Sequence, residues 1–224
     1  MDNKECLEEN KNLKKRLKES EKQIAQLNQI KLNYDILLAE LDKKDSELQK
    51  LNQKIEDLHV IDELTSLGNR KKFEDIFHTE FSRAKRNYYD LNFLLIDVDF
   101  FNKYKELYGS TKTNEVFKVL GEVLNNYARR GNDFVFRYED DKFTYITCFQ
   151  NEHEFLKLAQ SIKDAVYEKQ IEHKDNDHGF LTISIGAVIS RNKSLNKEDI
   201  FLQACENLEK SKKDGKNQVT MTVL

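Results

Sequence analysis

Hydrophobic and polar residues follow two different patterns along the chain, one up to about residue 59 and another after it. The first stretch is rich in Lys, Glu, Gln, Asn and Leu and contains a seven-residue repeat. One register of this repeat places at position d the residues Cys6, Leu13, Ser20, Leu27, Tyr34, Leu41, Leu48 and Ile55, and at position a the residues Asn3, Asn10, Leu17, Ile24, Lys31, Leu38, Asp45 and Asn52. Apolar d positions with charged flanks are typical of a coiled coil.

Residues 1–59 are therefore predicted to form a coiled-coil helix that dimerises the chain. The polar residues at position a reduce the stability of such a dimer but help to fix its register and its low oligomer number. A parallel homodimer is the simplest arrangement. The alternatives are a single solvated helix and a helix that docks on another protein.

Residues 60–224 alternate between strand-like and helix-like patterns. Apolar runs or alternating residues predict strands at 91–101, 133–138, 143–149 and 179–190. Helical spacing predicts helices at 112–127, 154–169 and 199–213, the last of them ended by Asp214-Gly215. The pattern predicts a single α/β (α+β) domain in which helices flank a sheet.

Composition and charge narrow the possible partners. The formal net charge is −3, which gives no electrostatic reason to expect nucleic-acid binding. No run approaches the ~20 apolar residues that a membrane helix requires, so no membrane insertion is predicted. Three scattered cysteines, Cys6, Cys148 and Cys205, lack metal-ligand spacing and are typical of reduced cytosolic thiols. The predicted location is the cytoplasm.

Four segments in order resemble the GGDEF domain of diguanylate cyclases. They are DELTSLGNR at 62–70, IDVDFF at 96–101, TISIG at 182–186 and KKDGKN at 212–217. The resemblance implies a polymerase-palm-like, mostly antiparallel sheet flanked by helices. It also implies an activity that joins two GTP molecules into cyclic di-GMP, with carboxylates that hold Mg²⁺ on the triphosphates.

The signature loop that gives the family its name is altered. Its five positions are occupied by Glu139, Asp140, Asp141, Lys142 and Phe143. Side chains replace the two glycines that would let the backbone approach a phosphate, and Lys142 replaces the catalytic carboxylate. Only Asp141 matches a functional position, where it could share one Mg²⁺ with Asp97. The alternative is that Asp97 only ends a strand and Asp141 is solvated.

Other nucleotide-binding positions of the family have changed as well. Lys105 stands in place of the guanine-reading Asn, and Asn114 in place of the second guanine contact, an Asp. Lys212 matches a phosphate-contacting Lys, and Lys216 replaces an Arg. These four residues form a residual nucleotide site at most. No competent catalytic residue and no required cofactor are expected, with Mg²⁺ as a companion only if a nucleotide binds.

One regulatory motif of the family remains. Arg130-Gly131-Asn132-Asp133 is an R-x-x-D sequence five residues before the altered loop, the position of the family's inhibitory site for cyclic di-GMP. The Arg fork suits guanine O6 and N7, and the Asp can accept hydrogen bonds from guanine N1 and N2. Gly131 is expected to form the tight turn, and Arg129 to add a second cation. The alternative is a surface turn pair.

Three functions follow from these residues. The first is a cyclic di-GMP receptor or adaptor that has lost catalysis, dimerises through its coiled coil and contacts an unidentified protein partner. The second is a divergent nucleotide cyclase. The third is a scaffold that binds no nucleotide.

Overall fold

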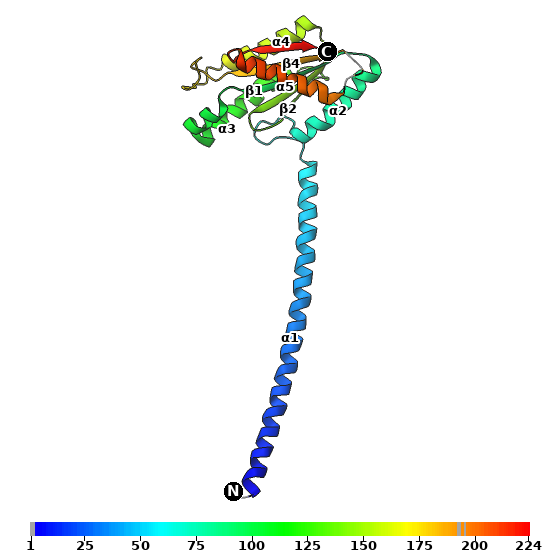
Figure 1. Cartoon of the computed structure of the whole chain (residues 1–224), viewed down its shortest axis with the longest axis vertical. Coiled ribbons are helices and arrows are strands. Elements are labelled where there is room, and N and C mark those ends of the chain that lie inside the picture. The colour runs from blue at the N-terminus through cyan, green and yellow to red at the C-terminus, as the bar shows by residue number, and fades with distance from the viewer. Residues whose placement is uncertain (1–2, 192–193, 195) are drawn as a thin grey trace. The chain divides into compact units, whose positions relative to one another are not determined.

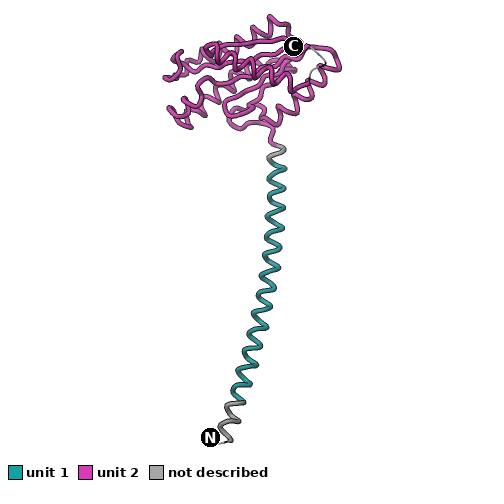
Figure 2. The backbone as a smooth tube through the Cα atoms, in the orientation of Figure 1, with its two compact units in different colours: residues 1–58 teal, residues 59–224 magenta. Residues whose placement is uncertain are grey.

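The computed structural model divides the chain into two units, residues 1–58 and 59–224 (Figure 2). The structure describes the backbone of residues 3–191, 194 and 196–224, and the side chains of these residues except 3–10 and 56–58. The heptad residues Asn3, Cys6 and Asn10 therefore lie outside the described side chains.

The first unit is one long helix, α1 (Asn3–Leu58), drawn in blue to cyan in Figure 1. Side chains at residues 11–55 are exposed throughout, including the leucines and isoleucines of the heptad positions. An isolated helix cannot bury such residues on itself, so its stability depends on packing against another surface. Within the described part of the chain, no helix is long and apolar enough to span a membrane.

The second unit contains a five-stranded sheet in the order β2-β3-β1-β4-β5. Its strands are β1 (Leu91–Val98), β2 (Phe134–Arg137), β3 (Lys142–Cys148), β4 (Ile183–Ser190) and β5 (Val219–Val223). All neighbouring strands are antiparallel except β4 and β5, which are parallel. The predicted fold class, a mostly antiparallel sheet flanked by helices and preceded by a long helix, is confirmed.

Helices cover both faces of this sheet (Figure 1). One core contains α3 (Phe101–Tyr127) and α4 (Glu152–Tyr167), and the other contains α2 (Arg70–Asn87) and α5 (Lys197–Lys213). The central strand β1 is buried along its whole length. Its successive residues alternate between the cores, with Leu94 and Ile96 in the first and Phe93 and Leu95 in the second.

Local sequence signals explain where several helices begin. Asn151 and Asn196 start α4 and α5 with complete capping boxes, paired with Glu154 and Asp199. Gly186 of β4 lets α5 lie close to the sheet, because a Cβ there would collide with the Ala204 carbonyl oxygen and the Leu208 nitrogen.

Differences from the predicted elements are concentrated in three places. The pattern missed α2, β5 and the first half of α3, and it assigned Phe101 to a strand although that residue begins α3. Within α3, Gly109 has φ 74° and ψ 177°, which breaks the helix into two arms. The first arm, before Gly109, is short, so its apolar spacing alone does not distinguish it from the strand-like run that precedes it.

Candidate functional site

The end of β1 places two aspartates in different environments. Asp99 lies just after the strand and is buried, where Thr182 and Ser184 donate hydroxyl hydrogen bonds to its carboxylate at 2.8 and 2.7 Å. The backbone N–H of Asn217 donates a third bond at 3.0 Å. Asp99 is thus fully engaged in joining three segments, and its role is structural.

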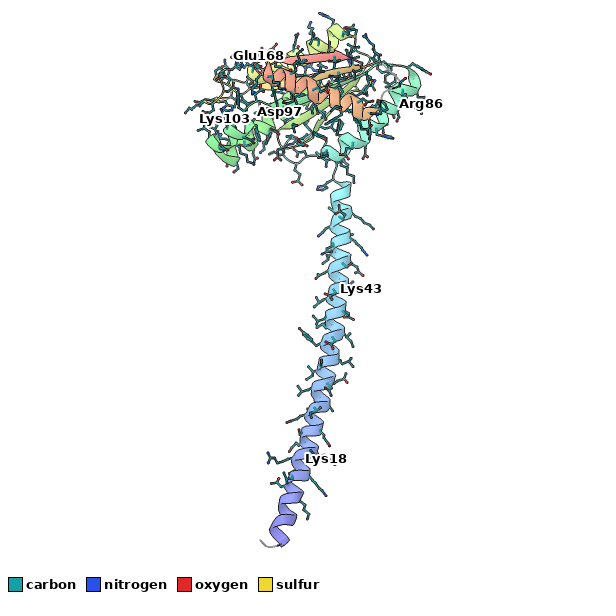
Figure 3. All side chains as sticks on the ribbon, viewed as in Figure 1. Lys18, Lys43, Arg86, Asp97, Lys103 and Glu168 are labelled. Atoms are coloured by element: carbon teal, nitrogen blue, oxygen red, sulfur yellow. The ribbon has the colours of Figure 1, made fainter. Side chains whose placement is uncertain are left out.

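Asp97, two residues earlier, is buried and paired with a lysine (Figure 3). The Nζ atom of Lys212, on the last turn of α5, lies 2.9 Å from Oδ2 of Asp97. Burial raises the pKa of the Asp97 carboxyl to about 6, and Asp141 pushes the pKa in the same direction, whereas the hydrogen bond from Lys212 opposes the rise. The lysine predicted to contact phosphate therefore neutralises the carboxylate predicted to hold metal.

The altered signature loop connects β2 to β3. Two backbone N–H groups, of Tyr138 and Glu139, donate to the carbonyl oxygen of Lys142, at 2.9 and 3.2 Å. Neither Glu139 nor Asp140 has a positive φ, so the turn has a backbone that any residue can adopt and retains no conformation reserved for glycine. The Nζ atom of Lys142 lies 2.6 Å from Oε2 of Glu139, so the cation of the loop pairs with one of its three carboxylates.

Arg137 holds this loop against the start of the domain. Its guanidinium donates to the carbonyl oxygen of Asp140 at 3.0 Å and lies 3.3 Å from Oδ2 of Asp62. The same guanidinium stacks on the ring of Phe117, 4.1 Å from its centroid. The DELTSLGNR segment and the loop are thus joined by one side chain that is mostly buried.

Of the two carboxylates predicted to share a metal, Asp97 lies on β1 and Asp141 lies in the turn immediately before the adjacent strand β3. Asp97 faces Lys142 in the β1–β3 register, and the N–H of Val98 donates to the carbonyl oxygen of Asp141 at 3.2 Å. A divalent cation would have to compete with Lys212 for Asp97. Among the described residues, no group of three or more His, Cys, Asp or Glu could hold a metal ion. A Mg²⁺ ion could bind these two carboxylates only by displacing Lys212, and the shared metal site stays a prediction.

The remaining nucleotide-binding positions are dispersed over the surface. Lys105 and Asn114 are exposed on the two arms of α3, on either side of the break at Gly109. Lys216 lies over the ring of Phe100, 4.7 Å from its centroid, and its Nζ is 3.4 Å from the carbonyl oxygen of Lys212. Lys103 also lies over the ring of Phe100, at 5.1 Å, so two cations contact the same aromatic ring.

The Arg130–Asp133 segment forms a separate turn between α3 and β2. The N–H of Arg130 donates to Oδ2 of Asp133 at 2.9 Å, and the N–H of Asp133 donates to the carbonyl oxygen of Arg130 at 3.0 Å. Thr147 of β3 donates its hydroxyl to Oδ1 of Asp133 at 2.7 Å. The carboxylate is therefore oriented by the chain itself, while Arg130 is exposed.

One detail of this turn differs from the sequence-based expectation, and a second adds to it. Gly131 lacks a positive φ, and a Cβ there would have no heavy atom within 4 Å, so the turn does not require glycine. Arg129 is exposed and donates its Nε–H to the carbonyl oxygen of Asn126 at 2.8 Å, which caps the end of α3.

The sequence did not indicate that Asp62, Arg137 and Thr147 take part in these two turns. Asp62 and Arg137 lie in recognised segments, but nothing in their spacing indicated the contact between them. Thr147 is an ordinary buried strand residue whose hydroxyl reaches Asp133 only because β2 and β3 pair. Their roles depend on strand register, which a local pattern does not show.

Comparisons with known proteins agree on the fold. The family model "Diguanylate cyclase, GGDEF domain" matches residues 59–218. Diguanylate cyclase DosC of Escherichia coli is 30% identical over 161 residues, which are 72% of this chain and 35% of DosC. The chain thus spans about a third of the length of that curated relative.

Two solved structures are similar at the level of fold. One contains the coiled coil and GGDEF domain of DgcB from Caulobacter crescentus in complex with c-di-GMP, with a TM-score of 0.68, 23% identity, and coverage of 83% of this chain and 99% of that one. The other is the diguanylate cyclase SiaD in complex with its activator SiaC from Pseudomonas aeruginosa. Its TM-score is 0.65 at 18% identity, with 98% and 87% of the two chains covered.

Proposed function

The chain belongs to the GGDEF domain family, and from that premise we propose that it is a cyclic di-GMP receptor that does not turn over GTP. The observation that carries the proposal is the contrast in charge between two turns of the domain. Arg130 presents an exposed cation beside a carboxylate held by Arg130 N–H and Thr147. In the altered signature loop, the cation Lys142 is already paired with Glu139.

The chemistry of the Arg130–Asp133 turn suits a guanine base. A guanidinium fork can donate to guanine O6 and N7, and a pre-oriented carboxylate can accept from N1–H and N2–H. The Arg130 N–H bonds one oxygen of Asp133 and the Thr147 hydroxyl bonds the other, and a carboxylate oxygen can accept more than one hydrogen bond, so Asp133 can also accept from a ligand. Arg129 adds a second positive charge next in the chain for the ligand phosphates.

Loss of turnover is inferred from the loop and from Asp97 together. A triphosphate would meet three carboxylates, Glu139, Asp140 and Asp141, with Lys142 as the one cation of the loop. The Asp97–Lys212 ion pair would also have to open before Asp97 could bind a divalent ion. Each change removes a separate requirement, and loss of one preorganised electrostatic group alone can cost ~10²–10³ in rate.

The wider assembly is also part of the proposal. The exposed apolar stripe of α1 supports a homodimer, and the polar faces of the same helix could contact an unidentified protein partner. The described cysteines, Cys148 and Cys205, carry no disulfide, which fits the cytoplasm as the predicted compartment.

Calorimetric titration of the purified chain with cyclic di-GMP tests the receptor function. We expect saturable binding that Arg130→Ala abolishes and that Arg86→Ala preserves, because Arg86 lies on the last turn of α2 and takes no part in the turn. Equal binding by both variants would mean that the ligand binds at a site other than the Arg130–Asp133 turn. Absence of binding by the wild type would refute the receptor and leave the scaffold.

A divergent nucleotide cyclase is the second candidate, favoured by the three lysines Lys103, Lys212 and Lys216 near the end of β1. Incubation with GTP and Mg²⁺, followed by separation of the products, distinguishes the two functions. We expect no cyclic di-GMP. Formation of product that Lys212→Ala eliminates would establish the cyclase instead.

A further inference from the structure

The described part of α1 carries an apolar stripe that no single heptad register explains. Its members are half to two-thirds exposed, from 50% at Ile55 to 63% at Leu27 and Ile30. Successive members are separated by three or four residues, or by seven where Ser20 or Lys44 intervenes. They are Leu13, Leu17, Ile24, Leu27, Ile30, Tyr34, Leu37, Leu41, Leu48, Leu51 and Ile55.

The register that suits the beginning of the stripe fails after Leu27. The single register of the sequence analysis pairs the row 27, 34, 41, 48 and 55 with Lys31, Leu38, Asp45 and Asn52, of which only Leu38 is apolar. A shift of one residue pairs the same row with Ile30, Leu37, Lys44 and Leu51, of which only Lys44 is polar. The shifted register therefore gives the more continuous seam over residues 27–55.

The opposite holds before Leu27. There the first register supplies Leu17 and Ile24, whereas the shifted one would supply Arg16 and Gln23. The register changes at Ile24, Leu27 and Ile30, which are spaced three residues apart. Such a three-residue irregularity in a heptad pattern is a stammer, which locally overwinds a coiled coil.

We propose that α1 pairs in parallel with α1 of a second copy of this chain through a seam of two registers that meet at Leu27. This inference rests on the proposed homodimer and specifies its interface. In the first register Arg16 and Glu21 occupy positions g and e, five residues apart, which face each other between parallel chains.

The second register gives Lys44 a defined role in the seam. Lys44 occupies a core position there, and its Nζ lies 2.9 Å from Oε2 of Glu47 on the same helix. Asp45 follows at the flanking position e, where it faces Lys44 of the partner subunit in a parallel pair. A single charge-paired cation inside an apolar seam fixes the register of the two helices at a cost in stability. The second register occupies the part of α1 that continues along the chain into residues 59–224.

Single cysteines at neighbouring positions distinguish the registers in the full-length chain. In a background with Cys6→Ser and Cys205→Ser, leaving the buried Cys148, we compare Leu51→Cys with Asn52→Cys under mild oxidation. Only core positions bring the two sulfurs within bonding distance, so we expect Leu51→Cys to cross-link at least about tenfold faster. Faster cross-linking of Asn52→Cys would restore the single register and overturn the proposal.

A second pair of variants separates failure of the register from failure of the dimer. Leu17→Cys should cross-link faster than Arg16→Cys whether one register or two run along the helix, because residues before Leu27 follow the first register in both cases, as long as a parallel dimer forms. Light scattering of the reduced protein reports the mass independently. A monomeric mass with no cross-linking at residue 17 would remove the proposed homodimer itself.

The buried cation gives a further test that uses no cysteine. Lys44→Leu should tighten the dimer dissociation constant about tenfold or more, because an apolar side chain replaces a charge in the seam. Lys43→Leu, on the neighbouring and outward position (Figure 3), should leave the constant unchanged. Equal effects of the two substitutions would place Lys44 outside the seam and refute the second register.

Discussion

Two turns of the same domain, residues 130–133 and residues 139–142, carry charges of both signs but use them differently. In the first turn, Asp133 is oriented by a backbone N–H and by Thr147, while Arg130 is exposed to solvent. In the second, Lys142 pairs with Glu139, and the neighbouring Asp97 pairs with Lys212. A ligand can meet the first turn as it stands, whereas at the second it must displace partners that the chain supplies.

This difference shows that the identity of the residues at a family's site says less about ligand binding than which of those residues are already paired with each other. Lys212 and Asp97 both match functional positions, yet together they form an ion pair that satisfies each of them. A buried carboxylate needs a cation or a proton, and a lysine in the chain provides the cation without any metal. The same residues would be free for a ligand only if both partners were released.

The comparison is tested most strongly by removing Lys212. Lys212→Ala leaves Asp97 buried without its cation, so we expect the free energy of unfolding to fall by about 3 kcal/mol at pH 8. The loss should shrink toward pH 5, where Asp97 takes up a proton instead. Lys213→Ala, at the exposed neighbouring position, serves as the control in urea unfolding at both pH values. A loss that is the same for both variants would mean that the ion pair does not hold this region.

The protonation of Asp97 gives the next largest effect. Its folded-state pKa of about 6 lies above the ordinary value of 3.8, so the native state binds more protons than the unfolded state between these values. Stability from this residue is therefore fully present below pH 3.8 and is lost as the pH rises through 6, with about 2 kcal/mol lost between pH 4 and 7. Asp97→Asn should lack this fall. Unfolding curves of both proteins between pH 4 and 7 measure the difference, and parallel profiles would contradict the raised pKa.

The fold class and most elements could be predicted because local patterns determine them. The alternation of β1, the capping residues of α4 and α5, and the charged repeat of α1 are all visible in consecutive residues. The first arm of α3 and the edge strand β5 were missed. β5 alternates Val-Thr-Met-Thr-Val but is a short edge strand, and Gly109 cuts the first arm of α3 short, so each pattern covers too few residues to be distinctive.

For the candidate site, the sequence predicted which positions are involved but not how their side chains contact one another. The resemblance identified Asp97, Asp141, Lys212 and the Arg130–Asp133 turn, but not which charges are already paired. The Asp97–Lys212 contact joins residues 115 positions apart, and the contact of Asp62 with Arg137 joins residues 75 apart. Such pairs arise from how α5 and the sheet pack, and no spacing along the chain indicates them.

A smaller effect is expected from the hydroxyl that orients Asp133. Thr147→Val removes a hydrogen bond of 2.7 Å to the carboxylate, which should cost about 1 kcal/mol of stability. It should also weaken cyclic di-GMP binding several-fold, because Asp133 loses one of the groups that fix its direction. Thr144→Val is a matched control on β3, since the Thr144 hydroxyl is buried without a hydrogen-bond partner among the described residues. Equal affinity of the two variants would mean that the orientation of Asp133 is irrelevant to binding.

The smallest effect concerns the pair that closes the altered loop. The side chains of Glu139 and Lys142 are 41% and 34% exposed, so water screens their contact at 2.6 Å. A double-mutant cycle with Glu139→Gln and Lys142→Gln should therefore give a coupling free energy of about 0.5 kcal/mol. A ligand that binds the loop can therefore break this ion pair at a small cost in free energy. Under the proposed function, a triphosphate is then kept away by the surplus of carboxylates over the single cation in the loop. Titration of the Glu139→Gln variant with GTP should accordingly show tighter binding than the wild type, and a coupling above about 2 kcal/mol with unchanged GTP affinity would instead make the ion pair itself the barrier.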